Sequence, residues 1–169
     1  MAKKSGLGRG LADIQAANPA SGYQPMISPI IFDHLTAKHG GATMDANTGD
    51  FLDTNDASKD TYIVGKAPDL EGKPIPTTPL SGAQGAFGHL SKIRRDVMAK
   101  TGNRPGVAIG SWQTPTGVDI DASELEPKLH VALAKATDRN EKAIFSTKKF
   151  RESGDNFDGD IANPNYKGE

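Results

Sequence analysis

Two aspartates one residue apart give this sequence its clearest arrangement for acid–base or metal chemistry. Asp119 and Asp121 lie in residues 118–122, where apolar and acidic residues alternate. In a β-strand this alternation places both carboxylates on one face, where they could share a proton or a divalent cation. A sheet buried on one face also carries polar residues on the other face by default. The pair remains a candidate for metal-assisted hydrolysis, but we predict a protein that is not an enzyme and has no catalytic residue.

Two other groups of residues partly match metal-site patterns. His34 and His39 are five residues apart, which separates them by about 140° around a helix, so they do not share a face. Residues 45–56 begin like an EF-hand loop, but Gly49 holds the fifth position instead of the sixth, and Asp56 replaces the final Glu. An Asx-rich turn is the preferred interpretation. We predict no metal and no cofactor, while metal binding by the acidic loop or by the aspartate pair stays open.

A basic cluster is predicted on a helix over residues 82–101. Lys92, Arg94 and Arg95 flank its apolar stripe and could contact phosphates. The formal net charge of −1 argues against a generally basic nucleic-acid binder. Phosphate-binding loops, dinucleotide fingerprints and nucleophile elbows are missing, and the absence of Cys excludes thiol catalysis, disulfides and iron–sulfur clusters. Nucleic acid is therefore a conceivable partner but not the favoured one.

The apolar content predicts a small core. Leu, Ile, Val and Phe make up 32 of the 169 residues, about 19%, close to the level at which disorder is suspected. The near-cancelling charges, however, favour a folded chain with much irregular backbone. We find no apolar run of transmembrane length and no secretory signal at the N-terminus. We therefore predict no membrane association.

Local patterns predict three helices and four strands. Apolar residues recur at helical spacing over residues 29–39, 82–101 and 127–139. Strands are predicted at 61–64, 107–112, 118–122 and 142–146, with a turn at 113–117 joining the second and third. A short hairpin is also expected around residues 47–49.

These elements predict an α+β fold with four parts along the chain. Residues 1–25 form an extended, flexible N-terminal arm, and residues 26–105 a helix and strand segment with a Pro-rich connector at 65–80. Residues 106–150 form a small, compact β-hairpin–helix–strand domain, and residues 151–169 an acidic C-terminal tail.

The arm combines positive charge with regularly spaced apolar residues. Its basic residues can form electrostatic contacts, and its apolar residues can form a short amphipathic turn on a partner. We predict that the arm binds another protein through Lys3, Lys4, Leu7, Arg9, Leu11 and Ile14.

Three stretches resemble a family of small proteins encoded by bacteriophages and mobile elements. They are Gly40-Gly41-Ala42-Thr43-Met44-Asp45-Ala46-Asn47-Thr48-Gly49-Asp50, then Ile109-Gly110-Ser111-Trp112 with Gly117-Val118-Asp119-Ile120-Asp121, and finally Asn140-Glu141-Lys142-Ala143-Ile144-Phe145. The resemblance covers about residues 40–146. This chain has Ala42 where the family usually has an aromatic residue, and Glu141 where it usually has Gln. The family carries no assigned activity, so the resemblance implies a phage or mobile-element origin and no catalytic residue.

The N-terminal tip has a second, shorter resemblance. Residues 3–11, Lys-Lys-Ser-Gly-Leu-Gly-Arg-Gly-Leu, are similar to the tip of ParB-type partition proteins, which contacts a ParA-type ATPase. Together the observations predict a non-enzymatic phage-type protein, virion-associated and acting by protein–protein contact, in the virion or the host cytoplasm. Its partners would be virion subunits, with homo-oligomers as a further option. The alternative is an intracellular accessory factor that binds a ParA-type ATPase or nucleic acid.

Overall fold

The computed structural model describes residues 40–81, 85–156 and 158–168. Within these ranges one seven-stranded sheet, paired antiparallel throughout, is combined with helices, which confirms the predicted α+β class. The strands are β1 (Gly41–Asp45), β2 (Tyr62–Val64), β3 (Thr78–Ser81), β4 (Val107–Thr114), β5 (Gly117–Glu126), β6 (Ala143–Ser146) and β7 (Asp160–Ala162). The helices are α3 (Gly85–Thr101), α4 (Leu129–Asp138), α5 (Thr147–Glu152) and the short 3₁₀ helix η1 (Gly154–Asn156).

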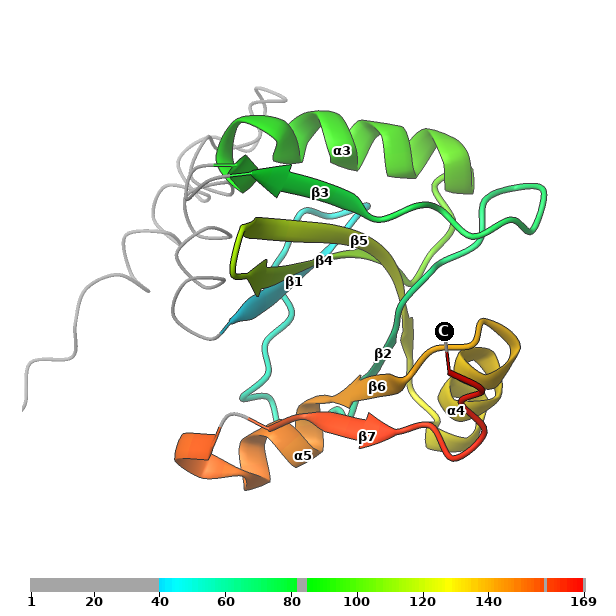
Figure 1. Cartoon of the computed structure of the whole chain (residues 1–169). Helices are drawn as coiled ribbons and strands as arrows, with labels where there is room; N and C mark the ends of the chain where they lie inside the picture. Colours follow the sequence, from blue (N-terminus) through cyan, green and yellow to red (C-terminus); the bar gives the residue numbers. More distant parts are fainter. Residues whose placement is uncertain (1–39, 82–84, 157, 169) are drawn as a thin grey trace, which may run out of the picture.

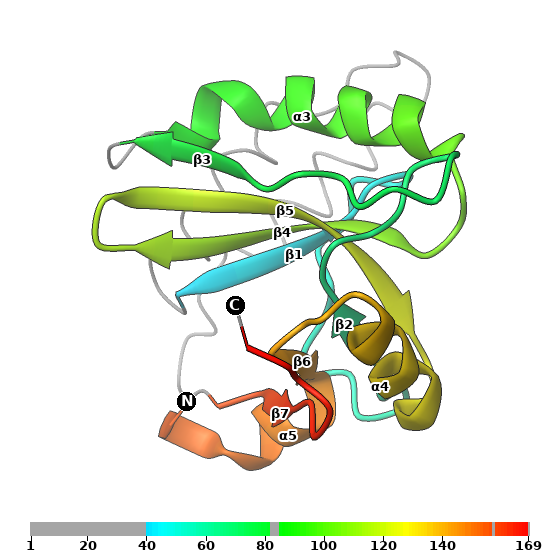
Figure 2. The same cartoon turned by 45° about the vertical axis from the view of Figure 1, so that its right-hand side comes forward.

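Strand β5 gives the sheet its curvature. One edge of β5 pairs with β4 along its length, while the other edge pairs first with β3 and then with β2. The strand order is β1-β4-β5-β2-β6-β7, so β1 and β7 lie at opposite ends of the sheet. In Figure 1, β5 bends from the layer beneath α3 toward β2 and β6. Figure 2 shows α5, β6 and β7 together in its lower part, with β1 and β4 above them.

The main core lies between α3 and the sheet. Along β5, Val118, Ile120 and Ala122 are buried while Asp119 and Asp121 point to the other face, as the alternation predicts. Leu90 and Val97 of α3 pack into the same cluster. The apolar stripe predicted for this helix is thus confirmed at its described buried positions.

A second, smaller core lies beneath α4. Ala132 and Ala136 pack against Val64 of β2 and Ile144 of β6. Leu129, which the periodicity places on the same stripe, is instead 39% exposed at the start of the helix. The two clusters sit on one face of the curved sheet, because Val64 of the second cluster lies opposite Glu124, which shares the face of Val118, Ile120 and Ala122 on β5.

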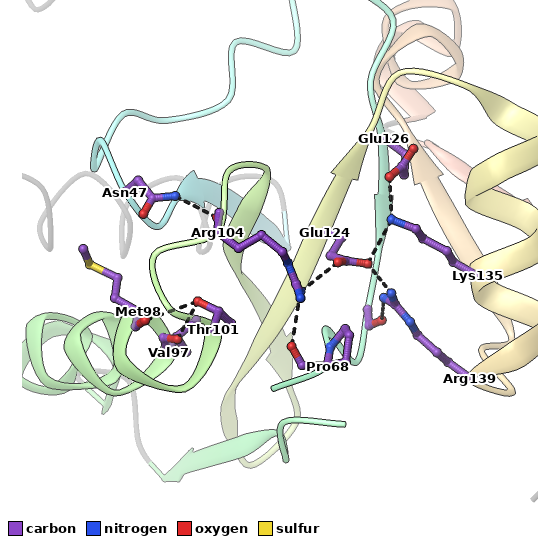
Figure 3. Close-up of polar contacts among 11 residues, drawn as sticks. Asn47, Pro68, Val97, Met98, Thr101, Arg104, Glu124, Glu126, Lys135 and Arg139 are labelled. Carbon is purple, nitrogen blue, oxygen red and sulfur yellow. Dashed lines mark hydrogen bonds and ion pairs between the residues drawn. The ribbon is translucent and has the colours of Figure 1, made fainter. Parts of the chain in front are cut away.

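A buried ion-pair network joins these two helical regions (Figure 3). Glu124 of β5 binds Arg104 at 2.8 Å and Lys135 at 3.2 Å, and it also accepts a hydrogen bond from Arg139. Burial acts to raise the pKa of Glu124, but the hydrogen bond and charge of Arg139 outweigh it and, with Lys135, hold that pKa below its usual range. Glu124 therefore stays ionised and links β5 to α4.

The structure corrects the predicted acidic tail. Residues after 150 contain η1 and β7, and β7 pairs with β6 in the register Ile144 to Ile161. The tail prediction failed because three-residue strands with exposed acidic neighbours carry no apolar periodicity.

The Pro-rich connector at 65–80 and the turn predicted at 113–117 also differ from the expectation. The connector ends in β3, where Pro79 lies opposite Asp119; among the described strands, β3 pairs with β5 alone. The predicted five-residue turn is shorter, because β4 extends to Thr114 and β5 begins at Gly117. The predicted arm and the helix over 29–39 lie outside the described residues.

Candidate functional site

A cavity of about 540 Å³ opens between the two ends of the curved sheet. This volume lies within the range of small-ligand sites. Its walls come from β1 and β4 on one side, from α5, β6 and the approach to β7 on the other, and from the segment that leaves β1. The described lining residues are Gly41, Ala42, Thr43, Leu52, Asp53, Thr54, Asn55, Trp112, Phe145, Phe150, Asn156, Asp158, Gly159 and Asp160.

Trp112 forms the wall of this cavity on the side of β1 and β4. It lies opposite Gly41 in the register of β1 and β4, and it is 57% exposed. A Cβ at Gly41 would lie 3.3 Å from the indole ring and 2.6 Å from the carbonyl oxygen of Ser111. The missing side chain at Gly41 therefore lets the indole lie across β1. The exposed fraction of 57% excludes Trp112 from the buried core.

Two phenylalanines form the opposite wall. The rings of Phe145 and Phe150 lie 5.4 Å apart between centroids, at a tilt of 43°. Gly159 is buried against Phe145, and a Cβ there would lie 2.4 Å from that ring. The backbone N–H of Ser146 donates to the carbonyl of Gly159 at 2.7 Å, which holds the two segments together. A glycine thus seats an aromatic ring on each wall.

Acidic residues complete the cavity. Asp53, Asp158 and Asp160 line it, and none of its described lining residues is basic. Lys149 of α5 binds the Asp158 carboxylate at 2.7 Å and donates to the carbonyl oxygen of Asp160 at 2.5 Å. The hydrogen bond from Lys149 lowers the pKa of Asp158, whereas burial, followed by the charge of Asp158, raises the pKa of Asp160. A single lysine therefore faces more negative charge than it can neutralise.

Short polar turns position the segment that closes the cavity. Asp53 accepts a hydrogen bond from the backbone N–H of Asn55 at 2.8 Å, and Asp56 does the same for Ser58 at 2.9 Å. Arg151 of α5 binds Asp60 at 2.6 Å and donates to the carbonyl oxygens of residues 54 and 56. The Asx turns expected in this acidic stretch are present, and Arg151 fixes them to the aromatic wall.

This arrangement suits a cationic group attached to apolar neighbours. Aromatic faces attract guanidinium and ammonium groups, and carboxylates at the rim add charge-assisted hydrogen bonds. Apolar atoms beside the cation would pack on the rings of Trp112, Phe145 and Phe150. An arginine or lysine side chain with a hydrophobic neighbour has this chemistry.

In place of the pair predicted on β5, Asp119 with Asp121, the structure pairs Asp121 with Glu141. Asp121 faces Glu141, which belongs to the turn before β6, across Gly65: a Cβ at Gly65 would lie 2.8 Å from one carboxylate and 3.2 Å from the other. Burial first, and the charge of Glu141 second, raise the pKa of Asp121 to about 6. Lys66 donates its backbone N–H to Asp121 at 3.3 Å and binds Glu141 through its side chain at 3.0 Å.

This second group is compact but lies apart from the cavity. Lys66 has a φ of 52° and Asn140, which precedes Glu141, has a φ of 51°, so two non-glycine residues adopt the left-handed region beside the carboxylates. Neither Asp121 nor Glu141 lines the cavity. Asp119, the other member of the predicted pair, is not among the groups that shift the pKa of Asp121. The sequence could not identify Glu141, because the turn at Asn140 decides where its carboxylate points.

The basic helix divides into an exposed part and a buried part. Lys92 and Arg95 are exposed on α3, so a role in phosphate contact stays a prediction for them. Arg94 is 8% exposed and donates to the carbonyl oxygens of Ala46 and Asn47, each at 2.6 Å. Its prediction as a nucleic-acid contact is therefore corrected: Arg94 holds the turn after β1 against α3.

The turn held by Arg94 accounts for the EF-hand-like start of the acidic loop. Asp45 accepts hydrogen bonds from the backbone N–H groups of Asn47 at 2.8 Å and Thr48 at 3.0 Å. Gly49 has a φ of 78° and lies against the Arg94 guanidinium. Within the described part of the chain, His, Asp and Glu form no group of three or more that could hold a metal.

The structure brings together stretches that carry the phage-family resemblance. The cavity takes Gly41–Thr43 from the first stretch, Trp112 from the second and Phe145 from the third. The predicted partner-binding residues of the arm, from Lys3 to Ile14, lie outside the described residues. Sequence reasoning missed Phe150, Asp158 and Asp160, and the only available signal was an aromatic and acidic composition near the C-terminus.

Comparisons with known proteins add no relative. No family model matches the chain, and neither the curated proteins nor the solved structures contain a match. In the described ranges, no helix has both the length and the apolar character to cross a membrane.

Proposed function

We propose that this protein is a non-enzymatic, phage-type protein that acts by protein–protein contact, as a virion-associated structural or accessory component. The cavity is its contact site, and it takes a basic side chain with apolar neighbours from a partner protein. One observation carries this proposal: three aromatic rings and three carboxylates line one cavity whose described walls contain no basic residue.

The seating of the rings supports a binding role. A Cβ at Gly159 would collide with the Phe145 ring, and a Cβ at Gly41 would collide with the Ser111 carbonyl oxygen and lie in tight contact with the Trp112 indole. Trp112 keeps more than half of its surface exposed, although a large aromatic side chain gains free energy by burial. A partner that covers the indole would supply this burial. The phage and virion parts of the proposal rest on the resemblance of the stretches that form these walls.

Binding can be measured through Trp112, because it is the single tryptophan of the chain. A blocked Leu-Arg-Leu tripeptide is titrated into the full chain, with blocked Leu-Glu-Leu as the matched control. We expect the cationic peptide to shift the tryptophan emission to shorter wavelength, and its affinity to fall with added salt. The Asp53→Asn/Asp158→Asn double variant should lose the response, and Asp138→Asn, at an exposed position of α4 outside the cavity, should keep it. Equal responses to both peptides would refute the contact site, and so would the lack of any response in both the full chain and a chain that lacks residues 2–14.

The virion assignment needs a separate measurement. Mass spectrometry of purified particles should detect the protein in stoichiometric amounts. Its absence from particles, while infected or carrier cells contain it, would refute the virion role and favour the accessory-factor alternative.

That alternative has one supporting observation, the exposure of Lys92 and Arg95 on α3. It predicts DNA binding that weakens steeply with salt, and loss of ATPase binding in Arg9→Ala. A salt-insensitive or absent signal would dismiss it.

A further inference from the structure

We propose that residues 3–14 of the same chain occupy the cavity in the isolated protein, so that a partner must displace them. This inference rests on the proposed function, because it concerns the regulation of the same contact site. It identifies the first occupant of the cavity from the chemistry of the two surfaces and from the length of chain that joins them.

Charge complementarity is the first argument. Residues 1–12 contain Lys3, Lys4 and Arg9 and no acidic residue. The cavity contains Asp53, Asp158 and Asp160, of which Lys149 pairs with one. A basic segment that enters the cavity would therefore neutralise carboxylates that the described fold leaves in excess.

Apolar complementarity is the second argument. Leu7, Leu11 and Ile14 follow a helical spacing of four and three residues, and Lys4, three residues before Leu7, falls on the same helix face. Aliphatic side chains on one face of about two helical turns would pack on the rings of Phe145 and Phe150, which lie 5.4 Å apart. The arm thus carries the pairing of cation and apolar neighbour that the cavity suits.

The length of the connecting chain permits the contact. Gly41 lines the cavity itself, so the N-terminal segment joins the described fold at the cavity wall. About 30 residues separate Arg9 from Gly41. A flexible chain of this length spans roughly 30 Å on average, more than the width of a cavity of this volume.

The tether favours the same chain over a second copy. A segment joined by a short linker has an effective concentration on the order of millimolar at its own site. A second copy at micromolar concentration competes poorly against it. Even weak complementarity therefore suffices for occupation within one chain.

The test compares three forms of the protein through the emission of Trp112. They are the full chain, a variant that lacks residues 2–14, and the Lys3→Ser/Lys4→Ser/Arg9→Ser variant. We expect both variants to show longer-wavelength emission and faster acrylamide quenching than the full chain, to an extent that does not depend on protein concentration. Circular dichroism verifies that all three forms are folded.

A synthetic peptide of residues 2–16 provides the second arm of the test. It should bind the truncated chain, and bind the full chain at least tenfold more weakly, because the tethered segment competes. A matched peptide with Ser at positions 3, 4 and 9 should not bind. Introducing Asp53→Asn/Asp158→Asn into the truncated chain should abolish binding of the basic peptide, and Asp138→Asn should not.

The outcomes separate this inference from the proposed function. Equal emission and equal peptide affinity in full and truncated chains would overturn it, and so would a concentration-dependent effect, which indicates docking between copies. If the truncated chain binds Leu-Arg-Leu but not residues 2–16, this inference fails and the contact site stands. If it binds neither peptide, both proposals fail.

Discussion

Two carboxylates on β5, Glu124 and Asp121, are three residues apart and face opposite sides of the sheet. Glu124 lies on the helix-covered side and binds three cationic side chains. Asp121 lies on the other side, beside a second carboxylate, Glu141, with one lysine nearby. The pKa of the first is lowered, and the pKa of the second is raised to about 6. The same strand thus carries two carboxyl groups whose pKa values are shifted in opposite directions.

This contrast extends to the whole sheet. On the helix-covered side, Arg94 and Glu124 satisfy their charges through contacts within the fold. On the opposite side of the sheet, which carries the cavity, Asp121, Asp158 and Asp160 leave negative charge in excess. We infer that the first side is built for stability and the second for contact, because unbalanced charge lowers stability and a bound cationic ligand would offset that cost.

The largest expected effect comes from removing a cation on the helix-covered side. Arg139→Met leaves Glu124 with Arg104 and Lys135 and removes a donor that is 12% exposed. We expect the free energy of unfolding to fall by about 2–3 kcal/mol in urea denaturation, since a buried charge loses a partner. Lys73→Met, which removes an exposed pair with Glu71, should cost less than about 1 kcal/mol. If Arg139→Met and Lys73→Met lowered the free energy of unfolding equally, the ion pairs of Glu124 would not stabilise the fold more than an exposed pair does.

The next effect concerns the wall of the cavity that Phe145 and Phe150 form. Gly159→Ala places a methyl group into the ring of Phe145, which must move. We expect a loss of about 1–3 kcal/mol in the free energy of unfolding, together with weaker tripeptide binding. Gly110→Ala is the matched control, because its Cβ would meet the Ser123 hydroxyl at an ordinary 3.5 Å. A stable Gly159→Ala protein with unchanged binding would show that the contact of Gly159 with Phe145 is not needed for the binding site.

A smaller effect, with a defined pH window, follows from Asp121. A carboxyl group whose pKa rises from 3.8 to about 6 binds its proton more tightly when folded. Its contribution to stability is present below about pH 4 and is lost as the pH rises through about 6. Asp121→Asn should therefore be more stable than the wild type by about 1–2 kcal/mol at pH 7, and equal to it near pH 4.

Urea denaturation at pH 4, 5, 6 and 7 measures this difference between the two proteins. Glu124→Gln should behave in the opposite way and lower stability at pH 7, because the ionised form of Glu124 is the stabilised one. If both variants shift stability in the same direction, the two faces of β5 do not differ as described.

The smallest stability effect is expected at Trp112. Because the indole is 57% exposed, Trp112→Ala should change the free energy of unfolding by less than about 1 kcal/mol. Isothermal titration with Leu-Arg-Leu should nevertheless show at least a tenfold loss of affinity. Leu70→Ala, at a side chain that is 72% exposed outside the cavity, should alter neither quantity. A large stability loss at Trp112 would make it a structural residue.

Local sequence signals predicted much of the helix-covered side. The alternation at residues 118–122 identified which side of β5 is buried, and apolar spacing identified α3 and α4. Capping and turn chemistry predicted the Asx turns of the acidic stretch. These signals succeed because each depends on neighbours within a few residues.

The candidate site was only partly predictable. Asp121 was paired with Asp119 from the sequence, but the structure places its carboxylate beside Glu141. Arg94 was selected as a surface cation and is buried, because α3 packs its side against the turn after β1. The residues of η1 and β7 were assigned to a tail, since strands of three residues leave no periodic pattern.

The sequence by itself determined the α+β class, the alternation along β5 and the basic character of the first residues, because all three follow from composition and short-range spacing. Only the tertiary structure decided that the sheet curves until β1 and β7 line the same cavity. That curvature arises because β5 exchanges β3 for β2 along one edge, and pairing between distant strands depends on register. The cavity, with Trp112 on one wall and Phe145 and Phe150 on the other, is a consequence of that exchange.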